Sequence, residues 1–306
     1  MKKRLFISTV AFLLSVSSFA QTRKVLWIGN SYTYVNDLPN VFRQLALSGG
    51  DTLIVDSSAP GGYTFLAHTT NATTLQKLAL TNNDFVVLQA QSQEPSFPPA
   101  QVASQTFPYA ELLDSLAHQG TPCAKTVFYM TWGRKYGDTQ NCPNYPPLCT
   151  FQGMNDRLRS SYKLMADANQ ALLAPAGMAW RKSWETDSTI NLWSADNSHP
   201  SLAGTYLTAC VFYGTILRKN PVGLSYTAGL NAVQAAYLQQ IAHSTVFDSL
   251  STWNIGRYDV NASFNYVLNG TTVNFENLST NATDFQWNYG DGNLSSEVAA
   301  NHNYEG

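Results

Sequence analysis

Apolar positions between residues 24 and 250 form short continuous runs that alternate with longer segments of helical spacing. The short runs predict strands at 24–28, 52–55, 84–89, 126–131 and 171–174. The longer segments predict helices at 38–47, 101–118, 153–170, 202–217 and 230–246. The run at 84–89 is continuous and rich in β-branched residues, which is typical of a strand buried on both faces. The alternation predicts an α/β fold, a three-layer sandwich in which helices cover both faces of a parallel sheet.

From about residue 253 the pattern changes to alternating apolar and polar positions. Period-2 segments occupy 260–267, 272–275 and 284–287, and Gly290-Asp291-Gly292 is a tight-turn signal. Asn, Thr and Ser become frequent in the same region. We therefore expect a large α/β domain at 21–252 and a small all-β module at 253–306.

The first twenty residues have the pattern of a cleaved secretory signal of bacterial type. Lys2, Lys3 and Arg4 precede the mostly apolar stretch 5–16, and Ser18-Phe19-Ala20 places small residues before the cleavage point. The apolar stretch is shorter than the roughly 20 residues that a spanning helix needs, which disfavours the alternative of a retained anchor. We expect a secreted, periplasmic or cell-surface protein without stable membrane insertion.

Charge and cysteine content narrow the class of partner. Charged residues make up 12% of the chain, the net charge is −2, and no basic run follows the signal, so nucleic acid is not an expected partner.

The four cysteines fit an oxidising compartment. Cys142 and Cys149 flank a stiff, proline-rich loop and are the expected disulfide, whereas Cys123 and Cys210 lie in apolar surroundings and are expected to be free and buried. No CxxC pair is present, and neither a metal nor a cofactor is expected.

Two short motifs about 170 residues apart supply the parts of an activated nucleophile. Gly29-Asn30-Ser31 follows the first predicted strand, and Asp196-Asn197-Ser198-His199-Pro200 precedes a predicted helix. A serine hydroxyl needs a base to take its proton, and a histidine base needs a carboxylate to orient it. Sites in open parallel sheets form at the carboxyl ends of the strands, where Ser31 is placed.

These motifs resemble those of the SGNH (GDSL-type) hydrolases, a flavodoxin-like α/β family of esterases and acetylesterases. The resemblance covers residues 24 to 250 and implies that Ser31 is the nucleophile, His199 the base and Asp196 its orienting acid. It also implies an oxyanion hole in which the N–H of Ser31 is joined by that of a glycine after the second strand. Gly62 is assigned this role, with Gly61 as the alternative.

The chain departs from the family pattern at two places. Asn30 stands where the family has an aspartate, and the third family block, Gly-x-Asn-Asp, is replaced by Leu88-Gln89-Ala90-Gln91-Ser92-Gln93. A glutamine amide can donate to an oxyanion as an asparagine amide does. Gln89 and Gln91 are the favoured donors, while Gln93 matches by its count from the strand. The pattern fits a secreted bacterial subgroup with a glutamine-containing third block.

The β module resembles a PKD domain, an immunoglobulin-like sandwich. The resemblance rests on the segment 272–280, on the run Phe285-Gln-Trp-Asn-Tyr-Gly-Asp-Gly292 and on His302-Asn-Tyr304 in that order. The sequence stops before the last strands of such a module, so we expect a truncated copy. The resemblance implies a spacer or a carbohydrate- and surface-associated module without catalysis.

Other polar and aromatic candidates are weaker. Trp132 and Arg134 follow the fourth predicted strand and could bind anionic or sugar groups of a substrate, although loop packing accounts for them equally well. His68, His118, His243 and His302 have no comparable partner and are interpreted as surface or packing residues.

The leading hypothesis is a secreted serine esterase that removes acetyl or other short acyl groups from a carbohydrate. The carbohydrate part depends on the predicted export, the PKD-like module, the abundant aromatic residues and the lack of a long hydrophobic lid. Two alternatives remain: a catalytically inactive polysaccharide-binding or adhesion protein, and a lipase- or thioesterase-type SGNH hydrolase. The expected partner is an acylated carbohydrate or another small ester.

Overall fold

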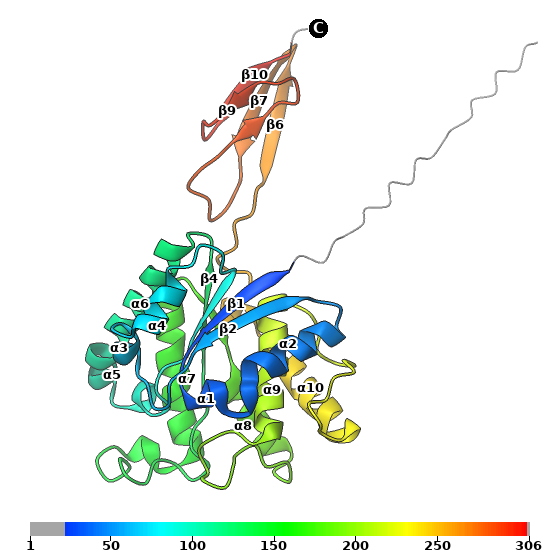
Figure 1. Ribbon diagram of the computed structural model, residues 1–306. Coiled ribbons are helices and arrows are strands. Elements are labelled where there is room, and N and C mark those ends of the chain that lie inside the picture. The colour runs from blue at the N-terminus through cyan, green and yellow to red at the C-terminus, as the bar shows by residue number, and fades with distance from the viewer. Residues whose placement is uncertain (1–21, 305–306) are drawn as a thin grey trace, which may run out of the picture.

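A computed structural model describes residues 22–304, and the predicted signal peptide therefore lies outside the described residues. Five parallel strands form the central sheet (Figure 1). They are β1 (Arg23–Ile28), β2 (Leu53–Ser58), β3 (Phe85–Leu88), β4 (Lys125–Tyr129) and β5 (Leu172–Ala174). Their order is β2-β1-β3-β4-β5, which is the flavodoxin-like order. The predicted α/β fold with a parallel sheet is confirmed.

The sheet is buried on both faces because helices cover both. The helices are α1 (Ser31–Tyr34), α2 (Leu38–Ser48), α3 (Phe65–His68), α4 (Ala72–Leu78), α5 (Pro99–Gln105), α6 (Phe107–Gly120), α7 (Phe151–Ala168), α8 (Ala176–Thr186), α9 (Leu202–Phe212) and α10 (Ala232–Phe247). On one side α9 packs against both α2 and α10, and on the other α6 packs against α4 and α7 (Figure 1). All four residues of β3 are buried, as the continuous apolar run predicted.

Three details of the helices differ from the sequence prediction. The predicted helix at 101–118 is two helices, because Thr106 leaves the helical conformation (φ −123°, ψ −50°) and Pro108 occupies the first turn of α6. The predicted helix at 202–217 ends its α-helical part at Phe212 and continues as a π-helical turn, Tyr213–Leu217. Helices α3, α4 and α8 were not predicted.

The C-terminal segment forms two small antiparallel sheets (Figure 1). One contains β6 (Phe264–Asn269), β7 (Thr272–Asn277) and β10 (Ala300–Asn303), and the other pairs β8 (Trp287–Asn288) with β9 (Leu294–Ser295). Before this segment, Trp253 and Ile255 are buried in the core of the α/β domain. Asp259 then forms ion pairs with Lys125 and Arg218, which fix the connection to the α/β domain. The all-β character agrees with the sequence, and the PKD assignment stays a prediction.

The cysteines separate into one pair and two free thiols. Cys142 and Cys149 form a disulfide, which is the pairing that the sequence predicted. Cys210 is free and buried, as expected. Cys123 is free but exposed, which corrects the prediction, because it lies in the turn before β4 rather than in the strand. Within residues 22–304, no helix is both long and apolar enough to span a bilayer.

Candidate active site

Ser31 lies at the carboxyl end of β1 and is the first residue of α1. Its hydroxyl Oγ is 2.8 Å from Nε2 of His199, although 168 residues separate the two in sequence. The side chain of His199 is 36% exposed, so the pair faces solvent. The structure therefore brings together the two motifs that the sequence singled out.

Asp196 completes this arrangement within a short turn. Its Oδ2 pairs with Nδ1 of His199, while its Oδ1 accepts hydrogen bonds from the backbone N–H groups of Ser198 at 3.0 Å and His199 at 2.9 Å. Asn197 adopts a positive φ of 59°, which allows the turn to close. Burial alone would raise the pKa of Asp196, but the hydrogen bonds from His199 and from the backbone outweigh it and hold the pKa below its usual value.

The geometry is that of a Ser–His–Asp triad. The carboxylate orients the imidazole so that Nε2 is available to the serine hydroxyl, and it stabilises the charge that forms when the imidazole takes a proton. Such an arrangement can activate Ser31 for attack on a carbonyl carbon.

A reciprocal pair of amides holds the turn that carries Ser31. The backbone N–H of Asn30 donates to Oε1 of Gln89 at 2.9 Å, and Nε2 of Gln89 donates to Oδ1 of Asn30 at 2.9 Å. Oε1 of Gln89 also accepts from the hydroxyl of Thr33 at 3.0 Å. Asn30 and Gln89 are both buried, so these bonds fix the nucleophile turn against the end of β3.

This network corrects the prediction that Gln89 is an oxyanion donor. Its side chain is fully buried, and its Nε2 donates to both Asn30 Oδ1 and the carbonyl oxygen of Ala90, so both N–H bonds are used. Gln91 is different, because its Oε1 accepts from the N–H groups of Gln93 and Glu94 while its Nε2 makes only a long contact of 3.4 Å with Gln93. Gln91 stays a candidate donor, whereas the Gln93 amide is taken up by Asp138 at 2.6 Å.

The second predicted donor, Gly62, lies in the exposed loop after β2. Nδ2 of Asn30 donates to the carbonyl oxygen of Tyr63 at 3.0 Å, which ties this loop to the nucleophile turn. Gly62 has a φ of 72°, a conformation that favours glycine, whereas Gly61 has no positive φ. The N–H groups of Ser31 and Gly62 remain the predicted backbone donors, and Ser31 begins a helix, where the first N–H groups have no intrahelical acceptor.

His68 is a supporting residue that the sequence interpretation missed. It is fully buried, with Nε2 at 2.8 Å from the carbonyl oxygen of Gly29 and Nδ1 at 2.8 Å from the hydroxyl of Thr74. Burial lowers its pKa, which favours the neutral ring, with Nε2–H donating to Gly29. No local signal could have identified it, because Gly29 is 39 residues away in sequence.

Gly29 itself is required by close packing. A Cβ at this position would lie 2.5 Å from Thr33 Oγ1 and 2.7 Å from Gln89 Oε1. Any side chain at this position would therefore push Gln89 away from the turn that carries Ser31.

Aromatic side chains hold the loop that carries His199. Nε1 of Trp132 donates to the carbonyl oxygen of Ser198 at 3.0 Å, and the hydroxyls of Tyr32 and Ser198 lie 2.6 Å apart. The Tyr32 and Trp132 rings are stacked with centroids 4.8 Å apart, and Trp132 stacks in turn on Trp180 at 3.6 Å. Burial raises the pKa of Tyr32 to about 12, so its hydroxyl stays protonated near neutral pH.

Trp132 is therefore not a substrate-binding residue, which corrects the prediction. Its side chain is fully buried and reaches the site through Ser198 and through the stacked ring of Tyr32, which packs against His199. Arg134 is partly exposed, with 29% of its side chain accessible, and it pairs with the buried Asp138 at 3.3 Å. Arg134 stays a candidate for substrate contact.

Glu94 is a half-buried carboxyl in the loop after β3. Its Oε2 is shielded from solvent and has no hydrogen-bond partner within the described residues. Burial raises its pKa to about 7. Over residues 22–304, no group of three or more His, Cys, Asp or Glu residues is arranged to hold a metal ion.

Solved structures similar to this chain define the class of fold. A candidate SGNH hydrolase from Slackia heliotrinireducens is 28% identical, with a TM-score of 0.52, and the match covers 64% of this chain and all of that one. The chain thus has an SGNH hydrolase-like fold. A DUF4886 family protein from Bacteroides uniformis superposes with a TM-score of 0.65 at 18% identity, covering 74% of this chain and 95% of that one. No protein-family model matches the chain, and no curated protein does.

Proposed function

We propose that the protein is a serine ester hydrolase that uses Ser31, His199 and Asp196. The observation that carries the proposal is the 2.8 Å contact between Ser31 Oγ and His199 Nε2, with Asp196 paired to the other ring nitrogen. An SGNH hydrolase-like fold and the position of Ser31 at the carboxyl end of β1 support it.

The proposed reaction has two steps. Ser31 Oγ attacks the ester carbonyl while His199 accepts its proton, and His199 then protonates the leaving alcohol as the acyl-enzyme forms. Water, deprotonated by His199, subsequently attacks the acyl-enzyme, and His199 returns the proton to Ser31 Oγ as the carboxylic acid is released. The N–H groups of Ser31 and Gly62 and the amide of Gln91 are the proposed donors to the oxyanion in both steps.

We further propose that the natural substrate is an acetylated carbohydrate outside the cytoplasm. The predicted secretion signal and the exposed, polar surroundings of His199 support a hydrophilic substrate. Arg134, partly exposed and close in sequence to Trp132, is the proposed contact for a polar group of the sugar.

The test is hydrolysis of p-nitrophenyl acetate by the protein and its Ser31→Ala variant. We expect the variant to lose activity by about 10³-fold or more, because only binding and oxyanion contacts remain. Ser104→Ala, an exposed position on α5, is the matched control and should retain full activity. An unchanged rate in Ser31→Ala would exclude the proposal.

Two further measurements separate the alternatives. Acetate release from acetylated polysaccharides identifies the carbohydrate substrate, and a preference for long-chain p-nitrophenyl esters would instead indicate a lipase- or thioesterase-type enzyme. Binding of a polysaccharide without any ester hydrolysis would support the inactive binding protein.

A further inference from the structure

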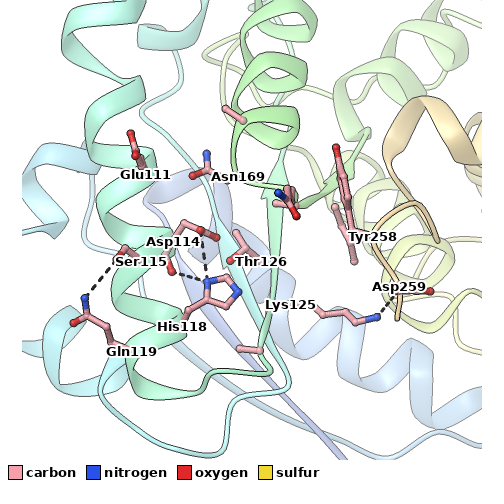
Figure 2. A pocket seen from close by; sticks show the side chains of 15 residues that line it. Glu111, Asp114, Ser115, His118, Gln119, Lys125, Thr126, Asn169, Tyr258 and Asp259 are labelled. Atoms are coloured by element: carbon pink, nitrogen blue, oxygen red, sulfur yellow. Dashed lines mark hydrogen bonds and ion pairs between the residues drawn. The ribbon is translucent and has the colours of Figure 1, made fainter. Parts of the chain in front are cut away.

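A large cavity lies away from Ser31, at the amino ends of β4 and β5. It is an open groove of about 740 Å³ between the C-terminal part of α6, the turn after α7 and the connection to the β module. We call it the amino-end groove, and it is lined among others by Glu111, Asp114, His118, Lys125, Asn169 and Tyr258 (Figure 2). Its volume falls within the range of about 300–1,000 Å³ that is usual for small-molecule sites.

Charges within the groove nearly balance, because each charged lining residue except Glu111 belongs to an ion pair. His118 lies 3.5 Å from Oδ2 of Asp114, and Lys125 lies 2.6 Å from Oδ1 of Asp259. The hydrogen bond that His118 donates to the Asp114 carboxylate raises the pKa of His118 to about 9, so this pair is ionised near neutral pH. Among the carboxylates that line the groove, only Glu111 forms no ion pair within the described residues. A groove with this balance favours neither a polyanion nor an apolar ligand.

The groove nonetheless offers many free hydrogen-bonding groups. Asn169 uses one N–H on the carbonyl oxygen of Met165 at 2.8 Å, which leaves its Oδ1 and its second N–H. The Glu111 carboxylate accepts and the Tyr258 hydroxyl donates or accepts. These donors and acceptors can pair with the hydroxyl groups of a ligand.

Tyr258 adds a flat apolar surface to this polar wall. Arg257 lies over its ring at 5.2 Å from the centroid. The wall is fixed, because Asn254 donates to Asp167 at 2.9 Å and to the carbonyl oxygen of Ala171 at 3.1 Å. Neutral hydroxyl-rich ligands with apolar C–H faces are the chemical class that matches free donors, free acceptors and an aromatic ring at balanced charge.

We infer that the amino-end groove binds a neutral oligosaccharide, as a second carbohydrate site separate from Ser31. The five residues of β4 separate the two edges of the sheet by roughly 15 Å, so one sugar unit does not reach both sites. On a polymer, the groove would hold one stretch of chain while another stretch enters the active site, and this raises the effective concentration of the substrate. The link to catalysis rests on the proposed esterase function, but the binding itself does not.

Direct binding tests the inference independently of catalysis. Isothermal titration of the Ser31→Ala protein with unacetylated xylohexaose, cellohexaose and mannohexaose should give binding to at least one of them. Tyr258→Ala and Glu111→Gln, each combined with Ser31→Ala, should weaken that binding by about tenfold. The exposed positions of the β module supply matched controls, Tyr266→Ala and Glu276→Gln, which should bind as the parent does.

Three outcomes would overturn the inference. They are no binding of any of the three hexasaccharides, equal binding by the groove variants and their controls, and tighter binding of acidic hexagalacturonate than of every neutral probe. Catalysis gives a second readout: the groove variants should raise KM on an acetylated polysaccharide and leave kcat/KM on p-nitrophenyl acetate unchanged. If the parent protein did not hydrolyse p-nitrophenyl acetate, the esterase proposal would be contradicted, but the titration would still test binding in the groove.

Discussion

The two halves of the candidate triad are held by different kinds of interaction. The turn that carries Ser31 is fixed by directional hydrogen bonds among buried amides and a buried imidazole: Asn30, Gln89 and His68. The loop that carries His199 is closed by hydrogen bonds within the loop itself, from Ser194 to the carbonyl oxygen of His199 and from the N–H groups of Ser198 and His199 to Asp196. It also rests on stacked aromatic rings, from which Trp132 donates one N–H to the backbone at Ser198. The first half thus depends on buried polar side chains from distant segments, and the second on bonds within its own turn and on an aromatic stack.

This difference sets the expected tolerance of each half. A buried amide that loses its partner carries the full desolvation penalty, whereas a stacked ring that loses one polar contact keeps most of its apolar burial. The nucleophile turn should therefore respond sharply to isosteric polar changes, and the His199 loop should respond gradually. The mutations below test this contrast, from the largest expected effect to the smallest.

Asp196→Asn should have the largest effect. The amide keeps the shape of the carboxylate but no longer stabilises a charged imidazole, so we expect kcat to fall by about 10³-fold or more with little change in KM. Steady-state kinetics on p-nitrophenyl acetate measures this. Asp187→Asn, at a partly exposed position outside the site, is the control. A loss below tenfold would show that Asp196 does not act on His199.

Asn30→Asp should come next. The variant restores the residue that is usual in the SGNH family, yet here a carboxylate would lose the donation to Tyr63 and place a charge in a buried site. We expect a loss of about 2–4 kcal/mol in the free energy of unfolding and a fall in kcat of about 10²-fold. Urea unfolding and kinetics measure the two effects. Asn274→Asp, exposed on β7, should change neither.

Trp132→Phe should have a smaller effect, since it removes the N–H to Ser198 and keeps a ring in the stack. We expect a loss of about 1 kcal/mol in stability and a several-fold fall in kcat, measured in the same assays. If Trp132→Phe reduced kcat more than Asn30→Asp did, the expectation that the Ser31 turn is the more sensitive half would be contradicted. Trp287→Phe in the β module is the control.

The prediction with the smallest expected effect on kcat concerns Glu94, which should change only how stability depends on pH. Its pKa in the folded protein is about 7, above its ordinary value of 4.5, so the folded state binds more protons than the unfolded state between these two values. The contribution of Glu94 to stability therefore falls as pH rises from about 4.5 to 7, by roughly 1–2 kcal/mol once solvent screening is allowed for. Glu94→Gln should remove this slope in urea unfolding measured across that pH range. An identical slope in the parent and the variant would contradict the prediction.

Sequence patterns were sufficient for the fold and for bringing Ser31, Asp196 and His199 together. The parallel sheet covered by helices follows from the alternation of apolar runs with helical segments, and the position of each motif at a strand or helix end located the site. The failure at Gln89 has a physical cause, since the direction in which an amide points depends on partners 59 residues away. Trp132 was ambiguous for a similar reason, because an aromatic residue after a strand is equally compatible with a cleft and with the core. The break at Thr106 was readable in principle, because Pro108 cannot continue the hydrogen bonding of a helix.

The ion pairs of Asp259 with Lys125 and Arg218 determine where the β module lies relative to Ser31. They fasten the β module to the edge of the sheet where the strands begin, and Ser31 lies at the edge where they end (Figure 1). A surface or polymer bound by residues 264–303 would therefore lie on the side of the domain opposite Ser31. A protein held in this way would act on polymer chains next to the one that its β module binds.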